Sequence, residues 1–347
     1  MKILLFCIIL KIILCEPLED MELKIHHDWE AYKKVNDLSF SNSEEKMRFD
    51  LYKENFLKVM EHNDEYDHNK TSYRASLNDF SHYNFEETVA LKFGLRSSFR
   101  FNDSSDEVVK NYNKTDLDEF MNEVRSARVI LPREVDWRRY SAAIKDQANC
   151  GACWAFAAIG VIESLYAIKY STLKRFSEQQ LVDCTLNNRR YLSYGCRGGW
   201  PDNAFEYVRQ NGIVEEAYYP YRRRANWCYQ RSDLRKVRIN RYFPLPIGNE
   251  EALKYAVATN GPVAVAVDAS SWGFIHYSSG IYRDNYCSSR RLTHAVIVMG
   301  YGTENGQDYW LIKNSWGARW GQNGYMKMAR NRRNMCGITS MASYAQL

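Results

Sequence analysis

One cysteine of this sequence stands where a thiol could act as a nucleophile. Cys153 opens the run 154–169, WAFAAIGVIESLYAIK, which is apolar at helical spacing around nearly its whole circumference. We therefore expect a buried helix there. A thiol at the start of such a helix lies beside unpaired backbone N–H groups and at the positive end of the helix dipole. Both favour the thiolate, which is the nucleophilic form.

A histidine and an asparagine farther along the chain could complete a catalytic set. His294 opens an apolar run that predicts a strand, and Asn314 closes a second such run. If the two strands are neighbours, the Asn314 carboxamide can orient the His294 ring, and the imidazolium would lower the pKa of Cys153 further. The other histidine after residue 131, His276, is expected to be structural or exposed.

The N-terminus and the cysteine count indicate an oxidising compartment. Residues 1–15, MKILLFCIILKIILC, carry an early lysine and an apolar run that is interrupted by Lys11. That run is too short for a hydrocarbon core of roughly 30 Å, so we expect a cleaved signal peptide and no membrane span. Without Cys7 and Cys15, seven cysteines remain, and an odd number in a secreted protein leaves one thiol for chemistry or intermolecular pairing.

Composition and charge divide the remaining chain into two parts. The 347 residues are enough for about two domains, and 45% hydrophobic residues argue against a disordered or low-complexity chain. Residues 16–130 carry 16 Lys and Arg against 25 Asp and Glu, a net −9, whereas residues 131–347 carry 29 against 17, a net +12. We expect the two parts to attract each other, unless both are merely solvated surfaces. The scattered arginines and the secretory route argue against a nucleic-acid partner.

The elements that must position these residues indicate an α+β fold. Three runs of the basic part predict strands, namely 262–267, 295–301 and 309–313. The acidic part predicts a helix through 47–66, with one apolar face formed by Met47, Leu51, Phe56, Val59 and Met60.

A polar stretch at 97–130 is expected to be an exposed linker. Three glycosylation sequons precede residue 131, at Asn69, Asn102 and Asn113, which favours a solvated surface for them. Cys150 and Cys153 could also form a CxxC redox motif or half of a zinc site. The first would need a βαβ context and the second another ligand pair, and neither is apparent in the sequence.

The motifs around these residues resemble the papain family of cysteine proteases, and within it the cathepsin L-like enzymes. CGACW at 150–154 matches the family's signature around its catalytic cysteine. GCRGGW, LTHAVIVMGYG and YWLIKNSWGARWGQNGY follow at 195–200, 292–302 and 309–325. The resemblance covers essentially all of 131–347. It implies a papain-like two-domain fold, with a helical left domain, a β-barrel-like right domain and a cleft between them.

The acidic part resembles the family's inhibitory propeptide. The helical pattern consists of Glu44, Arg48, Tyr52, Asn55, Val59 and Asn63, and a shorter motif follows at Asn78-Asp79-Phe80. The resemblance implies that residues 16–130, here called the prosegment, cross the cleft in the reverse direction, and that acid weakens their attraction to residues 131–347. His82 stands where the family usually has Asp, which puts an Asp-dependent pH trigger in doubt.

The resemblance also assigns roles to individual residues. Cys153 would attack the scissile carbonyl, His294 would protonate the leaving amine, and Asn314 would orient His294. The Gln147 side chain and the Cys153 N–H would bind the oxyanion. Trp316 would shield the Asn–His hydrogen bond, and Gly198 and Gly199 would leave backbone free to pair with an extended substrate.

A pocket and three disulfides follow from the same resemblance. The residues that match the family's main pocket are uncharged, which favours Leu, Val, Phe or Tyr two residues before the scissile bond. They are Trp200, Pro201, Ala269, Leu292, Ala295 and Met341. The implied disulfides are Cys150–Cys196, Cys184–Cys228 and Cys287–Cys336, which leave Cys153 unpaired.

The implied function is that of a cysteine endopeptidase made as an inactive zymogen. Expected partners are protein and peptide substrates, the prosegment itself and cystatin-type inhibitors, with a monomer, no metal and no cofactor. The expected location is lysosomal or secreted. Two departures from the family stand near the nucleophile, since Ala148 replaces Gly and Ala152 replaces Ser. Because the Ala148 methyl could crowd the oxyanion loop if φ is positive there, an impaired homologue acting as a binding or inhibitory protein is the alternative.

Overall fold

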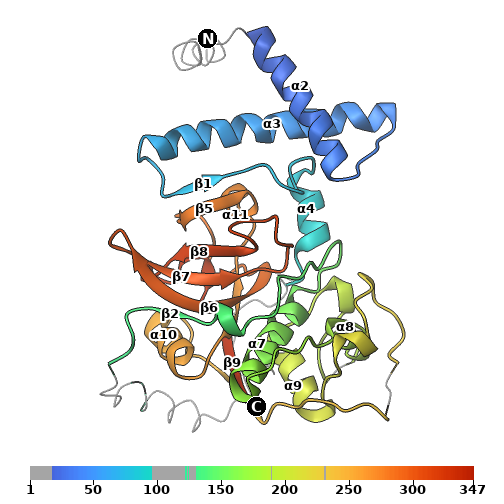
Figure 1. The fold of residues 1–347 in the computed structure, drawn as a ribbon, viewed down its shortest axis with the longest axis vertical. Helices are drawn as coiled ribbons and strands as arrows, with labels where there is room; N and C mark the ends of the chain where they lie inside the picture. Colours follow the sequence, from blue (N-terminus) through green and yellow to red (C-terminus); the bar gives the residue numbers. More distant parts are fainter. Residues whose placement is uncertain (1–17, 96–121, 123, 125–129, 189, 230–231) are drawn as a thin grey trace.

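The computed structural model of the chain describes residues 18–95, 122, 124, 130–188, 190–229 and 232–347 (Figure 1). The expected signal peptide, most of the expected linker, Asn102 and Asn113 lie outside these residues. The prosegment helices lie across one end of a body with a helical part and a strand-rich part (Figure 1). The α+β class is confirmed.

Two long helices of the prosegment form a small core of their own. Helices α2 (Leu18–Val35) and α3 (Asn42–Asp67) cross at the top of Figure 1. Acidic residues in the first turn of α3 complement the positive end of its dipole. The side chains buried between the two helices are Ile25, Trp29, Tyr52 and Phe56.

The predicted helix at 47–66 is present as α3, but its predicted apolar face is wrong. Of the five residues assigned to that face only Phe56 is buried, and Met47 is 45% exposed. The buried residues of α3 are Arg48, Tyr52, Asn55 and Phe56.

Polar contacts to distant residues explain this difference. Arg48 Nη1 donates to Glu87 Oε2 at 2.7 Å and to the backbone oxygen of His82 at 3.2 Å. Asn55 Oδ1 accepts a hydrogen bond of 2.8 Å from the Trp272 indole, across the boundary with the basic part. Because satisfied polar groups can be buried, apolar spacing alone does not identify the inner face of this helix.

The prosegment then joins the central sheet. Strand β1 (Tyr73–Ala75) pairs antiparallel with β5 (Tyr277–Tyr282) of the basic part. Helix α4 (Phe85–Lys92) follows and begins with a capping box between Asn84 and Glu87. It leads the chain down between the helical and strand-rich parts, to Leu95 (Figure 1).

The helical part is built around α7 (Cys153–Tyr170). Fourteen of its 18 residues are buried, which confirms the predicted buried helix. By length and composition it is the one helix of the described residues that could cross a membrane, but 78% of it is buried within the protein, as expected of a core helix. Helices α8 (Glu178–Cys184) and α9 (Pro201–Asn211) pack against it.

The strand-rich part contains the three predicted strands as β4 (Val263–Val267), β6 (His294–Glu304) and β7 (Gln307–Lys313). The order in the sheet is β1-β5-β8-β7-β6-β4-β9-β3, and β2 pairs with β6. The other elements are β2 (Val135–Asp136), β3 (Arg241–Pro244), α10 (Glu250–Thr259), α11 (Trp272–Ile275), β8 (Tyr325–Ala329) and β9 (Ala342–Gln346).

The β6–β7 hairpin brings two candidate catalytic residues to one end of the sheet. The strands are antiparallel neighbours, with Ile297 opposite Lys313. Asn305 and Gly306 connect them with φ values of 50° and 75°, the positive values that a tight hairpin turn requires. His294 is the first residue of β6 and Asn314 follows the last residue of β7, so both lie at the end of the hairpin away from this turn.

Candidate active site

Cys153 is the one unpaired sulfur among the seven cysteines that follow residue 131, all of which are described. It is the first residue of α7 and is fully buried. The three predicted disulfides, which use the other six cysteines, are present. The first of them, Cys150–Cys196, ties the loop that precedes Cys153 to the loop that precedes α9.

His294 and Asn314 meet as the strand prediction required. The distance from His294 Nε2 to Asn314 Oδ1 is 2.7 Å, and both residues are buried. Asn314 Oδ1 also accepts from the Ser315 backbone N–H at 2.8 Å, so this oxygen is the acceptor and His294 Nε2–H the donor. The Trp316 ring lies 4.7 Å from the His294 ring between centroids and covers this pair.

Gln147 lies in the loop that leads to Cys153, with its side chain in a fixed orientation. Its side-chain oxygen accepts a hydrogen bond of 2.7 Å from the Ser315 hydroxyl, so its amide nitrogen faces the other way. That nitrogen donates to the backbone oxygens of Cys150 and Lys92, both at 2.9 Å. The Gln147 amide, which was predicted to bind the oxyanion, therefore donates to the Lys92 carbonyl of the prosegment in this form.

Ala148 has the positive φ that the sequence raised as a concern. Its φ is 50°, a left-handed conformation that is unfavourable for an alanine by about 1–2 kcal/mol. Its backbone N–H donates to Asp146 Oδ1 at 2.7 Å, which holds the turn in place. The oxyanion loop, which contains Gln147 and Ala148, is therefore formed, but Ala148 is strained in a way that a glycine would not be.

The prosegment covers the sulfur. The Gly94 backbone oxygen accepts from the Gly199 N–H at 3.1 Å, and the Leu95 N–H donates to the Thr293 oxygen at 3.2 Å. A Cβ built on Gly94 would lie 3.0 Å from Cys153 Sγ and 2.0 Å from the Gly151 oxygen. The backbone of Gly94 thus fills the space directly over the nucleophile, where no side chain fits.

This cover favours the neutral forms of Cys153 and His294. Burial raises the pKa of Cys153 to about 11, although the backbone N–H groups of Ala295, Gly94 and Trp154 favour the thiolate. Burial likewise lowers the pKa of His294 to about 4, opposed by the bond to Asn314. Burial in this covered form therefore disfavours the thiolate–imidazolium pair expected from the sequence, because the charged forms would lose their hydration.

Two family models match this chain. Residues 131–346 match the model described as papain family cysteine protease, and residues 29–88 match the cathepsin propeptide inhibitor domain (I29). The chain belongs to the papain family of cysteine proteases. It carries a cathepsin-type propeptide in front of the protease domain, and is therefore a zymogen of the cathepsin L and S type.

Relatives of this protease share nearly its whole length. A cathepsin L of Sarcophaga peregrina is 38% identical, with 99% of both chains covered. A cathepsin S of Mus musculus is also 38% identical, covering 93% of this chain and 91% of that one. The solved digestive procathepsin L2 of Tenebrio molitor larval midgut is 38% identical at a TM-score of 0.82, covering 93% of this chain and 100% of that one.

The residues predicted to bind substrate come from four places in the protease fold. Gly198, Gly199, Trp200 and Pro201 lie at and just before the start of α9, and all are buried. Ala269 and Leu292 flank Thr293, whose hydroxyl accepts from the Ala269 N–H at 2.9 Å and whose N–H donates to the Val267 oxygen. Ala295 follows His294 in β6, and Met341 precedes β9 and is half-buried.

The remaining predicted sites are not part of the catalytic centre. His276 is buried and stacks on Trp272 with 4.9 Å between ring centroids, in line with a structural residue. Of the three sequons, Asn69 is described and lies in the exposed turn after α3, with φ of 58°.

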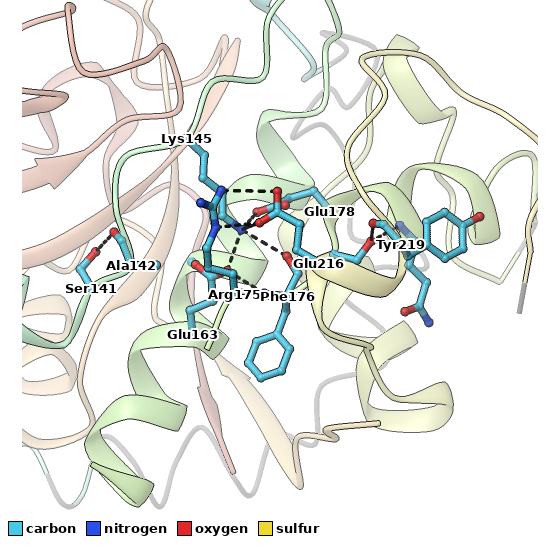
Figure 2. A network of polar contacts seen from close by, with 12 residues as sticks. Ser141, Ala142, Lys145, Glu163, Arg175, Phe176, Glu178, Glu216 and Tyr219 are labelled. Atoms are coloured by element: carbon cyan, nitrogen blue, oxygen red, sulfur yellow. Dashed lines mark hydrogen bonds and ion pairs between the residues drawn. The ribbon is translucent and has the colours of Figure 1, made fainter. Parts of the chain in front are cut away.

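A buried ion network supports the oxyanion loop of the protease (Figure 2). Lys145 Nζ lies 2.6 Å from Glu163 Oε1 and 2.7 Å from Glu178 Oε1, and Glu216 Oε2 is 3.7 Å away. Both nearer carboxylates are only 1% exposed. Since Glu163 lies on α7 and Glu178 on α8, the network fixes the backbone two residues before Gln147 to both helices.

The charged contacts between the prosegment and the protease domain could not be predicted from the sequence. Two ion pairs join the described residues of these parts, Lys92–Asp146 at 3.7 Å and Asp79–Arg319 at 2.8 Å. In the first pair the prosegment carries the positive charge, against the net charges of the two parts. No local pattern signals such pairs, because their partners are far apart in the sequence.

Proposed function

We propose that this protease is a cysteine endopeptidase that acts through an acyl-enzyme. In the uncovered cleft, the Cys153 thiolate attacks the scissile carbonyl, and His294 gives its proton to the amine as the C–N bond breaks. A water that transfers a proton to His294 then hydrolyses the thioester and releases the acid. The observation that carries the proposal is the free Cys153 at the start of α7, close to the His294 end of β6: Gly94 packs over its sulfur, and the next residue, Leu95, is bonded to Thr293, the neighbour of His294.

The supporting groups follow from the same geometry. With Nε2 held by Asn314 at 2.7 Å, Nδ1 is the ring nitrogen left to serve Cys153, and it has no partner within the described part of the chain. Trp316 keeps water from the Asn314–His294 bond. The Gln147 amide and the Cys153 N–H stabilise the oxyanion, where the Lys92 carbonyl now sits.

We further propose that the prosegment inhibits because it runs against the direction of a substrate. Phe93 lies 6.2 Å from both the His294 and the Trp316 rings, on the side where the amine leaves, and Leu95 lies on the side of Thr293 and Gly199. A substrate would have its N-terminal residues on the Gly199 side. The prosegment has them on the other side, so its peptide bonds are misaligned for attack, and its removal activates the enzyme.

The main pocket is proposed to accept hydrophobic or aromatic residues two before the scissile bond. The buried Leu95 supports this proposal, because it is an apolar residue on the acyl side with its backbone bonded to Thr293. None of the predicted pocket residues is charged. We expect a higher kcat/KM for peptides with Phe or Leu at that position than with Arg, and equal values would contradict this pocket.

The proposed route is the secretory pathway, ending in a lysosome or outside the cell. It rests on the apolar leader at 1–15, which we propose is cleaved, and on three disulfides, which persist in oxidising compartments. The linker after Leu95, up to about residue 130, is the proposed region of maturation. A monomer that cystatin-type inhibitors can block, and glycans at the three sequons, complete this proposal.

The nucleophile can be tested directly. The acid-treated full chain should react with one equivalent of an epoxysuccinyl reagent at Cys153 and lose peptidase activity in proportion. Mass spectrometry of the labelled peptide identifies the site. Activity that survives in Cys153→Ala, or a label on another residue, would contradict the assignment.

A catalytically impaired homologue is the second candidate, because the Ala148 strain lies in the loop that carries Gln147. In that case Cys153 would still be alkylated, but the labelled and unlabelled proteins would both fail to cleave a peptide panel. Restoration of activity by Ala148→Gly would favour this second candidate over the first.

A further inference from the structure

A prosegment lysine occupies a charged position beside the oxyanion loop. Lys92 Nζ lies 3.7 Å from Asp146 Oδ1, and 5.2 Å from the centroid of the Phe80 ring. The Lys92 side chain is only 10% exposed, whereas Asp146 remains 45% exposed beneath it. A carboxylate of the protease domain is thus partly open to solvent and holds a cation that leaves with the prosegment.

This position lies on the leaving-group side of Cys153. The Phe80 ring is 5.1 Å from the Trp316 ring, and Phe93 lies 6.2 Å from both Trp316 and His294. From the sulfur outward on this side, the prosegment therefore places Gly94, Phe93 and Lys92 in succession. A substrate running the other way would place its first residue after the scissile bond near Phe93, and its second near Lys92.

Asp146 is held in place by its neighbours, so its carboxylate can interact with a charged side chain of a substrate. Its Oδ1 accepts the Ala148 N–H at 2.7 Å, and its backbone forms an antiparallel bridge with Trp316. Burial and, more weakly, the charge of Arg223 lower the pKa of Lys92, whereas Asp146 and Asp79 of the prosegment raise it. On the same side, farther out, Arg319 pairs with Asp79 at 2.8 Å.

We propose that Asp146 is a specificity-determining residue that favours Lys or Arg as the second residue after the scissile bond. The proposal rests on the endopeptidase function proposed above. Once the prosegment leaves, a substrate cation takes the place of the Lys92 ammonium beside the carboxylate. Because the site is partly open to water, the gain is that of an exposed ion pair, up to about fivefold in kcat/KM for Lys over Gln.

The test compares internally quenched peptides that differ only at this position, with Phe two residues before the scissile bond. The enzyme is the full chain after acid processing, with its active sites counted by an epoxysuccinyl reagent. We expect kcat/KM to fall in the order Lys, Gln, Glu, with a Lys/Glu ratio of about 3 to 10 at low salt that shrinks as salt is raised.

Two variants distinguish a charge effect of Asp146 from a general change in the oxyanion loop. Asp146→Asn keeps an oxygen acceptor for the Ala148 N–H, and should bring the Lys/Glu ratio to about 1 or below, because Arg223 remains. Arg223→Gln removes the opposing charge and should raise the ratio. Because each ratio is taken within one variant, a change in overall activity does not affect it.

Each result has a distinct meaning. A wild-type ratio near 1, a preference seen only at the first residue after the scissile bond, or a ratio unchanged by Asp146→Asn would overturn the role of Asp146 and leave the endopeptidase intact. Failure of every peptide to be cleaved by a chain whose Cys153 is alkylated would overturn the proposed function and this inference with it.

Discussion

Replacement of His82 should shift the pH at which the zymogen is activated. His82 is 3% exposed and packs among Tyr32, Phe40 and Tyr83 of the prosegment. Its Nδ1 lies 2.6 Å from the Tyr32 hydroxyl, which in turn donates to the Asn78 oxygen at 3.0 Å. Because the Tyr32 hydroxyl hydrogen is given to Asn78, Nδ1–H of His82 is the donor of this bond, and burial of the ring in the prosegment core favours its neutral form.

The magnitude follows from the two states of the prosegment. Burial, followed by the nearby Arg48 guanidinium, lowers the pKa of His82 from 6.5 to about 4, with Glu87 acting in the opposite direction. An unfolded prosegment therefore takes up this proton near pH 6.5 and the folded one only near pH 4. The contribution of His82 to the folding free energy of the prosegment is fully present above pH 6.5. It decreases as the pH falls, by about 2 kcal/mol at pH 5 and about 3 kcal/mol at pH 4.

Two measurements on the full chain test this value. In a Cys153→Ala background, which prevents self-processing, the free energy of unfolding of the prosegment should fall about 2 kcal/mol less between pH 7 and pH 5 in His82→Asn. The asparagine amide can replace Nδ1 as a hydrogen-bonding group but does not titrate. With Cys153 present, His82→Asn should slow self-processing at pH 5 by about 30-fold.

The exposed His68 provides the matched control, because His68→Asn changes the same residue type at the end of α3 without altering the prosegment core. Identical pH profiles for His82→Asn and the wild type would refute this role of His82. Protonation of the prosegment carboxylates would then be the explanation of the acid response.

Three further predictions concern packing and strain. Ala148→Gly should raise stability by about 1 kcal/mol, seen as a higher Tm, because φ of 50° costs a glycine little; an unchanged Tm would contradict the strain. Gly94→Ala should release the prosegment and allow processing at neutral pH, since its Cβ would meet the Gly151 oxygen at 2.0 Å; a zymogen that stays latent would argue against this contact. Lys145→Met should destabilise the protease domain by about 3–5 kcal/mol in urea unfolding, because two buried carboxylates lose their cation; Glu163→Gln added to it should recover part of the loss.

The positions of the candidate catalytic residues could be predicted because local patterns determine them. Apolar spacing predicted that Cys153 begins a buried helix, and strand runs placed His294 and Asn314 at strand ends. Whether the two strands are neighbours depends on the Asn305-Gly306 turn, which is also local. The strain at Ala148 was anticipated only as a condition, since the sequence does not give its φ.

The prosegment was harder to predict, because its contacts join residues far apart in the sequence. The inner face of α3 carries Arg48 and Asn55, which are buried only because Glu87 and Trp272 satisfy them. The net charges of the two parts suggested a general attraction. The Lys92–Asp146 pair has the opposite polarity, which no count of charges could indicate.

Because β1 of the prosegment pairs with β5, the zymogen and the processed enzyme differ at one edge of the sheet. In the zymogen β5 has β1 on one side and β8 on the other, whereas after processing the described strands leave it β8 alone. The backbone of Tyr277–Tyr282 then becomes an open edge, which can pair with an extended segment of another molecule. Maturation therefore exposes backbone N–H and C=O groups along one edge of the sheet that β1 covers in the zymogen.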